Sequence, residues 1–212
     1  MNTPLNKRNH LLAPLIVKAL QSRNFDAYYV ENSADAVQKA LSLIPQDHVV
    51  SWGGSATLEQ TGLLDAVKKR NKVIDRDLAP NREEKTALMR QALLADTFLT
   101  SANAISEDGQ IVNIDGTGNR IAATIFGPTN VIFIIGMNKV CKTLDDAMSR
   151  ARNYAAPVNA QRFPDLNTPC SVSGSCADCK SDHCICAYIL TTRFSKPAHK
   201  IKVILVNEVL GF

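Results

Sequence analysis

The sequence predicts an α/β protein with a mainly parallel central sheet and flanking helices. The first observation is that short strands, rich in β-branched and aromatic residues, alternate along the chain with longer amphipathic helical segments. The second is that glycine turns follow predicted strands and precede predicted helices, as in open parallel sheets. With 212 residues, of which 45% are hydrophobic, the chain is long enough for one domain with a buried core.

Apolar periodicity and capping residues place the helices. Ser33 and Asn81 are good N-cap residues, because their side chains can accept a hydrogen bond from the first helical turn. Gly62 is expected to break the third helix. The predicted helices are residues 5–22, 34–44, 55–70, 82–95, 118–126 and 143–154.

Alternating or fully apolar runs place the strands. A Glu-Asp-Gly turn ending at Gly109 predicts a hairpin into the strand that follows it. The predicted strands are residues 25–31, 47–52, 72–75, 96–105, 110–115 and 131–136, with a final strand within 191–212.

Three segments make up the predicted domain. Residues 1–154 form the α/β core, and residues 187–212 supply closing strands of the same domain. Between them, residues 155–186 are expected to form an irregular cysteine-rich excursion, because this segment has little periodicity and is rich in Pro, Ser, Asn and Cys.

The N-terminal stretch 1–20 combines basic residues with an apolar run, as an export signal would. Pro14 and Lys18 interrupt the run, and no small-residue cleavage site follows it. We therefore expect an amphipathic helix, no membrane insertion and a cytoplasmic location. The formal charge of +4 comes with no basic run, which argues against nucleic-acid binding and is compatible with a small anionic metabolite as ligand.

A glycine turn in VVSWGGSATLEQ, between a predicted strand and a predicted helix, is the first candidate ligand site. Gly53 and Gly54 let a ligand approach the backbone, and the N–H groups at the start of the next helix favour anions. The hydroxyls of Ser55 and Thr57 could donate hydrogen bonds as well. The stretch matches neither a P-loop nor the GxGxxG fingerprint, so a plain strand-to-helix turn remains the alternative.

Polar residues also stand in the central block TSANAISEDGQIVNIDGTGNR. Ser101 and Asn103 follow a predicted strand. Asn119 and Arg120 follow a glycine turn, and an arginine there can recognise a carboxylate or phosphate. The alternative is that the asparagines are simply turn residues.

Asn138 and Lys139 follow the buried strand 131–136, so they too stand at a strand end. Lys139 could neutralise an anionic ligand, although most lysines are solvated. Arg162 is a further candidate for the same cleft. Cys141, isolated in sequence, is interpreted as a small buried residue rather than a nucleophile.

Five of the six cysteines lie in the stretch PCSVSGSCADCKSDHCIC. In a reducing compartment such a cluster indicates a metal-binding or redox-active site rather than disulfides. Its CxxC pair is a standard chelating unit, and four thiolates suit zinc or an iron–sulfur cluster. The spacing fits neither the ferredoxin run nor a paired zinc ribbon, so zinc, an iron–sulfur cluster and a metal-free segment remain open. A dithiol catalyst at Cys176 and Cys179 is disfavoured, because the segment lacks the strand-to-helix setting that lowers a thiol pKa. The candidate ligands are Cys170, Cys176, Cys179, Cys184, Cys186 and, as a further candidate, His183.

These stretches, together with IIGMNKVCKTLDDAMSRARNYAAPVNAQR, resemble the LUD (lactate-utilisation domain) family, and in particular its short, free-standing LutC-like members that end in a cysteine segment. The resemblance implies a fold like that of sugar-phosphate isomerases and CoA-transferases, with the candidate residues facing one cleft at the strand ends. It also implies that Cys170, Cys176, Cys179 and Cys186 are the family-typical positions and that Cys184 is an addition in this sequence.

Three functions remain open. The resemblance favours a component of L-lactate oxidation to pyruvate, working with iron–sulfur partner subunits of a lactate-oxidising complex. The second is an isomerase- or CoA-transferase-like enzyme that binds a phosphorylated or CoA-type molecule, with Glu59 and Asp115 as candidate nucleophiles. The third is a non-enzymatic regulatory or structural subunit with zinc. The sequence assigns no catalytic residue.

Overall fold

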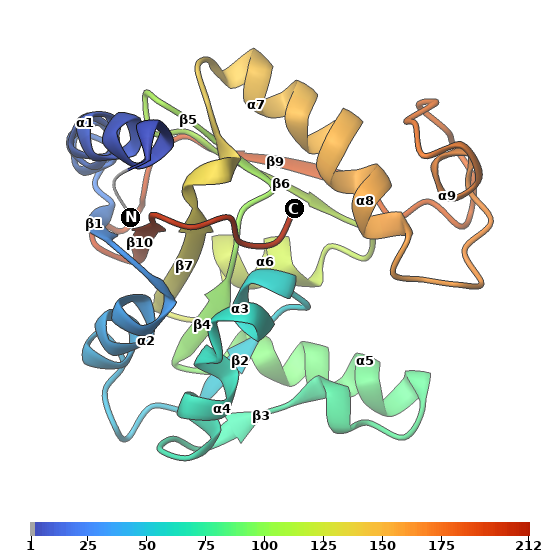
Figure 1. Cartoon of the computed structure of the whole chain (residues 1–212). Coiled ribbons are helices and arrows are strands. Elements are labelled where there is room, and N and C mark those ends of the chain that lie inside the picture. Colours follow the sequence, from blue (N-terminus) through green and yellow to red (C-terminus); the bar gives the residue numbers. More distant parts are fainter. Residues whose placement is uncertain (1–2) are drawn as a thin grey trace.

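Within residues 3–212, the part of the chain that the structure describes, six parallel strands form a central sheet with helices on both faces (Figure 1). The structure is a computed structural model, and it confirms the α/β class. The order across the sheet is β1–β10–β7–β4–β2–β3. Its strands are β1 (Asp26–Val30), β2 (Val50–Trp52), β3 (Val73–Ile74), β4 (Thr97–Thr100), β7 (Asn130–Gly136) and β10 (Ile201–Val206). Residues 1 and 2 of the predicted core segment lie outside the described residues.

A second, smaller sheet has the order β8–β5–β6–β9 in the described chain. Strand β6 pairs antiparallel with both of its neighbours, whereas β5 and β8 are parallel. The strands are β5 (Ala104–Ser106), β6 (Ile111–Asp115), β8 (Val140–Cys141) and β9 (Tyr188–Thr192).

The helices lie close to their predicted positions. Asn81 caps α5 as expected, and Gly62 ends α3 with a left-handed φ of 74°. The cap of α2 is Asn32 rather than Ser33, because the Asn32 side chain accepts from the backbone of Asp35. The helices are α1 (Pro4–Gln21), α2 (Ser33–Ser42), α3 (Ala56–Thr61), α4 (Leu63–Lys68), α5 (Arg82–Gln91), α6 (Asn119–Ile125), α7 (Leu144–Arg150), α8 (Ala156–Ala160) and α9 (Pro169–Ser173).

Three segments differ from the expected elements. The predicted strand 96–105 is divided between β4 in the central sheet and β5 in the second sheet. The helix expected at 143–154 continues through a π-helical turn, Ala151–Ala155, into α8, so the irregular excursion begins only after Ala160. The buried alanines of this continuous helix, Ala147, Ala151 and Ala156, pack against the second sheet, which explains why the helix is extended. The closing segment contains two strands in two different sheets.

Strand β7 shows why the sequence forms a two-faced sheet. All seven of its residues are buried. Val131, Phe133 and Ile135 pack on the side of α1 and α6, whereas Ile132 and Ile134 pack on the side of α2, α3 and α4. A parallel strand covered on both faces requires such a continuous apolar run. No helix in residues 3–212 has the length and apolar character needed to cross a bilayer.

Truncation at the centre of β7 should reduce stability strongly. Ile134 is fully buried, so Ile134→Ala is expected to lower the free energy of unfolding by about 3 kcal/mol through lost burial and a cavity. Leu11→Ala on α1 is the control, because Leu11 is 78% exposed and its loss should change stability by less than about 0.5 kcal/mol. Urea denaturation of both variants measures the difference, and equal losses would contradict the packing described.

Candidate functional site

The carboxyl ends of three neighbouring strands bring the predicted residues together. Strands β2, β4 and β7 lie side by side in the sheet and run parallel, so the segments that follow them meet at one edge. Gly53 follows β2, Ser101 follows β4, and Met137–Lys139 follow β7 as a short 3-10 turn.

Lys139 lies at the centre of this edge and is almost fully buried, at 2% exposure. Its ammonium donates to Thr57 Oγ1 at 2.9 Å, Ser101 Oγ at 3.1 Å and the Ala102 carbonyl at 3.1 Å. These acceptors are neutral, and the ammonium forms no ion pair with any of the residues 3–212. Burial above all, together with the charges of the nearby Arg150 and Arg120, lowers the pKa of Lys139 to about 7. A buried cation without a counter-ion is costly, so the site is suited to an anion.

A small pocket of about 40 Å³ opens beside Lys139, and we call it the cation pocket. Its basic lining residues are Arg120, Lys139 and Arg162, and no acidic residue of the described chain lines it. The volume suits a ligand of only a few non-hydrogen atoms. The C-terminal residues Gly211 and Phe212 close one side.

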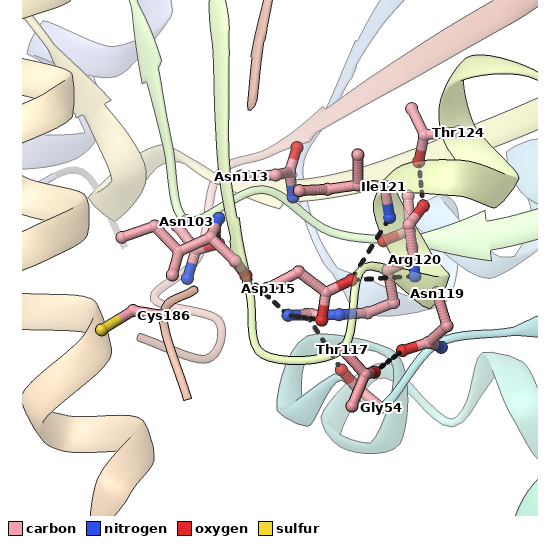
Figure 2. A network of polar contacts seen from close by, with 12 residues as sticks. Gly54, Asn103, Asn113, Asp115, Thr117, Asn119, Arg120, Ile121, Thr124 and Cys186 are labelled. Atoms are coloured by element: carbon pink, nitrogen blue, oxygen red, sulfur yellow. Dashed lines mark hydrogen bonds and ion pairs between the residues drawn. The ribbon is translucent and has the colours of Figure 1, made fainter. Parts of the chain in front are cut away.

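Arg120 is fixed by contacts to the backbone and to one carboxylate (Figure 2). Its guanidinium donates to the Ile114 carbonyl at 2.7 Å and to the Gly54 carbonyl at 3.4 Å, and it lies 3.5 Å from Asp115 Oδ1. The other oxygen of Asp115 accepts from the backbone N–H groups of Arg120 at 2.9 Å and Ile121 at 3.3 Å, which holds the start of α6 in place. Asp115 is therefore a structural anchor for Arg120.

Gly53 is required by this arrangement for a steric reason. A Cβ atom at residue 53 would lie 2.3 Å from both Cγ and Cδ of Arg120. Gly53→Ala should therefore displace Arg120 and lower the free energy of unfolding by about 1–3 kcal/mol. In an Arg120→Ala background the same substitution should cost much less, so a double-mutant cycle by chemical denaturation tests the contact. Additive costs would contradict it.

A second, larger cavity of about 710 Å³ adjoins the cation pocket, and we call it the arginine cavity. The two share Gly54, Arg120, Asn159, Arg162 and Ile185. Asn119 lines this cavity, and its side-chain oxygen accepts from the Thr117 hydroxyl at 2.7 Å.

Most of the predicted ligand residues line the cation pocket, namely Gly54, Ser55, Thr57, Ser101, Asn103, Arg120 and Lys139. Gly53 lies against Arg120 instead, and Asn119 lines the arginine cavity. The Asn138 side chain accepts from the Leu210 backbone at 3.1 Å and lines neither cavity. Two predicted ligands also have structural roles, because Ser55 caps α3 and the Asn103 side chain accepts from the Ile114 backbone.

Sequence reasoning missed Arg76 and Asn159, which also line these cavities. Arg76 follows the predicted strand 72–75, so its place at a strand end was the available signal. Arg162 does reach the cation pocket. No comparable signal marked Asn159, whose position depends on the extension of the helix into α8.

All five clustered cysteines line one cavity of about 180 Å³, which we call the cysteine cavity. Cys184 Sγ and Cys186 Sγ are 3.3 Å apart, and all six cysteines are free thiols. Burial, and then the neighbouring Cys184, raise the pKa of Cys186 to about 12. Among the described residues no three His, Cys, Asp or Glu side chains are already arranged to hold a metal ion. His183 does not line the cavity.

The cysteine cavity and the cation pocket share a wall formed by Ile114, Ala156 and Ile185. Residue 185 lies between Cys184 and Cys186, so the thiol segment itself lines the edge of the cation pocket. Cys141 is separate, since it lies in β8, is half-buried and lines none of the three cavities. Burial raises its pKa.

Comparison with known proteins identifies the family. The family model described as the LUD domain matches residues 13–206, nearly the whole chain. The chain belongs to the LUD domain family. This confirms the resemblance that the motifs indicate. No match was found among the curated proteins.

One solved structure has a similar fold over nearly the whole length of this LUD domain chain. A DUF162 family protein from Deinococcus radiodurans has a TM-score of 0.54 and 13% identity, covering 94% of this chain and 98% of that chain. At this identity the similarity shows the fold alone. Two further structures are too distant to support any argument. Ribose 5 phosphate isomerase A from Neisseria gonorrhoeae has a TM-score of 0.34 and 15% identity, covering 53% of this chain and 54% of that chain. For eIF2B delta from Chaetomium thermophilum the TM-score is 0.32 and the identity 17%, covering 68% of this chain and 59% of that chain.

Proposed function

We propose that this LUD domain protein binds a small carboxylate, lactate or its oxidation product pyruvate, in the cation pocket as a component of lactate oxidation. The observation that carries the proposal is the buried ammonium of Lys139, which has only neutral partners and lies beside two arginines. A carboxylate there would compensate the charge of Lys139, because Arg120 and Arg162 already lie near the carboxylates of Asp115 and Glu59.

The size and lining of the cation pocket support a small acid rather than a larger metabolite. A volume of about 40 Å³ suits a ligand with a two- or three-carbon skeleton. The hydroxyls of Thr57 and Ser101 both lie within hydrogen-bond distance of Lys139, and as donors or acceptors they suit a 2-hydroxy or 2-oxo group next to the carboxylate. Membership of the LUD family supports lactate as the acid.

The donor set of the cysteine cavity fits a thiol-ligated metal centre. Five soft thiols line one cavity whose other walls are largely apolar, and the ligands would close around a metal on binding. Cys170, Cys176, Cys179 and either Cys184 or Cys186 would hold it. A bound iron–sulfur cluster would supply one-electron chemistry, whereas zinc would be structural. Oxidation of lactate to pyruvate releases two electrons and two protons, and we propose that iron–sulfur partner subunits accept the electrons.

The alternative of a CoA-transferase-like enzyme receives less support from the candidate nucleophiles. Asp115 is occupied by two backbone N–H groups and by Arg120. Glu59 is 56% exposed and pairs with Arg162 at 3.5 Å. Neither carboxylate is presented free to a substrate in the cation pocket.

Calorimetric titration of protein purified without oxygen tests the proposal. Saturable binding of L-lactate or pyruvate is expected, and lactamide serves as the matched control because it has nearly the same shape without the charge. Lactamide should bind at least about tenfold more weakly. Equal affinity for lactate and lactamide would contradict a carboxylate site.

A further inference from the structure

The arginine cavity contains positive charge beyond what it shares with the cation pocket, because Arg76, Arg82, Lys85 and Arg90 line only the larger cavity. Six basic side chains line it against three acidic ones. The acidic groups are already engaged: Asp115 holds α6, Glu59 pairs with Arg162, and Asp77 lies 3.4 Å from Lys85. Within residues 3–212, Arg82 and Arg90 have no ion-pair partner at all. The cavity is therefore strongly cationic.

Arg76 is the most buried of these basic groups, and its donors are poorly satisfied. Its side chain is only 17% exposed, and its Nε is buried without a hydrogen-bond partner among the described residues. One Nη contacts only the sulfur of Met89, at 3.4 Å, and the nearest oxygen of Asp77 is 3.7 Å from Nε, beyond hydrogen-bond distance. A guanidinium has five N–H donors, and leaving them unused in a buried site is costly unless a ligand accepts them.

The glycine turn places Arg76 next to Arg120. A Cβ at residue 54 would lie 2.6 Å from Nη2 of Arg76, just as a Cβ at residue 53 would lie 2.3 Å from the side chain of Arg120. Two successive glycines thus each accommodate one arginine, and both arginines line the same cavity. Desolvation by burial, and then the charge of Arg120, lower the pKa of Arg76. Two neighbouring guanidinium groups repel each other until an anion lies between them.

We propose that the arginine cavity binds an organic phosphate, with a dianionic phosphoryl group held between Arg76 and Arg120. A phosphoryl group offers three oxygens to two planar forks, which a single carboxylate cannot match. The volume of about 710 Å³ accommodates a ligand far larger than the cation pocket does. The two sites share Arg120, but Arg76 lines only the arginine cavity, so a substitution of Arg76 tests this site separately from lactate binding.

Titration with inorganic phosphate and pyrophosphate, in sulfate-free buffer of low ionic strength, tests this site. Both should bind wild-type protein saturably, and Arg76→Gln should weaken them by about tenfold or more. Arg76→Lys, which keeps the charge and loses the fork, should have a smaller effect and shows that the site still folds. Lys69→Gln is the control, because Lys69 is exposed, lines none of the cavities and removes the same charge.

The outcomes separate this site from the lactate site. Arg76→Gln should leave L-lactate binding within about threefold of wild type. The proposal is overturned if wild-type protein binds neither phosphate nor pyrophosphate saturably up to about 10 mM. It is also overturned if Arg76→Gln and Lys69→Gln weaken binding equally, since that result would show diffuse charge attraction instead of a site.

Discussion

Lys139→Met is expected to weaken lactate binding by about a hundredfold, the largest effect of any single substitution in the cation pocket. The methionine has nearly the volume of the lysine stem, so the pocket should keep its shape while losing the buried ammonium. The two arginines of the pocket remain, but both are partly exposed and engaged with other groups. Calorimetric titration with L-lactate and with pyruvate measures the loss.

Lys142→Met is the matched control for this substitution. Lys142 lies three residues further on, is 78% exposed and pairs with Glu107 at the surface. Its loss should change lactate affinity by less than about twofold. If the two variants bind lactate equally well, with thermal melts showing both folded, Lys139 is not the anchor of the site.

The pKa of Lys139 gives lactate binding a definite pH dependence. In the free protein the pKa is lowered to about 7, and an anion beside the ammonium raises it in the complex. Affinity should therefore be constant below pH 7 and fall by up to about tenfold per pH unit above it. Stability has the opposite sign: the unfolded chain binds the Lys139 proton more tightly, so this residue makes the unliganded fold more stable as pH rises above 7. Lys139→Met should remove both dependences.

Cys176→Ser and Cys179→Ser are each expected to lower the metal-to-protein ratio by more than about tenfold, because each substitution removes one ligand of the chelating pair. Iron, zinc and acid-labile sulfide are measured on protein purified without oxygen, together with visible absorbance. Iron with sulfide would support a redox role, and zinc would support the structural alternative.

Cys141→Ser is the control for the cysteine experiment, because Cys141 lies outside the cysteine cavity. Its metal content should equal that of wild type. Retention of metal by both cavity variants, or loss of metal in Cys141→Ser, would show that the cysteine cavity is not the metal site. Wild-type protein without metal would favour the metal-free alternative.

The strand-end rule predicted much of the candidate site. Ser101 and Lys139 follow predicted strands, Thr57 follows the glycine turn, and the family resemblance implied one cleft for all three. They line one pocket because β2, β4 and β7 are parallel neighbours. The burial of Lys139 was not predictable in the same way. It results from the C-terminal residues and the turn after β4 closing over the side chain, which local sequence does not encode.

Other features depended on tertiary packing that no local pattern reveals. Arg76 lies close after the two-residue strand β3. Its burial in the arginine cavity depends on the glycine turn, which packs against it, and on α5, which lines the same cavity. Asn138 follows β7 as predicted, yet its side-chain oxygen accepts a hydrogen bond from the Leu210 backbone instead of lining either cavity. The thiol segment contacts the cation pocket because β9 pairs with β6, which brings residue 185 against Gly116.

Proton uptake on lactate binding tests the central claim most directly. Titrations at pH 7 in two buffers with different ionisation enthalpies give the number of protons taken up per ligand. With the pKa of Lys139 at about 7 in the free protein, we expect uptake of about half a proton in wild type and none in Lys139→Met. Lactate binding without proton uptake, or with the same uptake in the variant, would contradict an anion site built on Lys139.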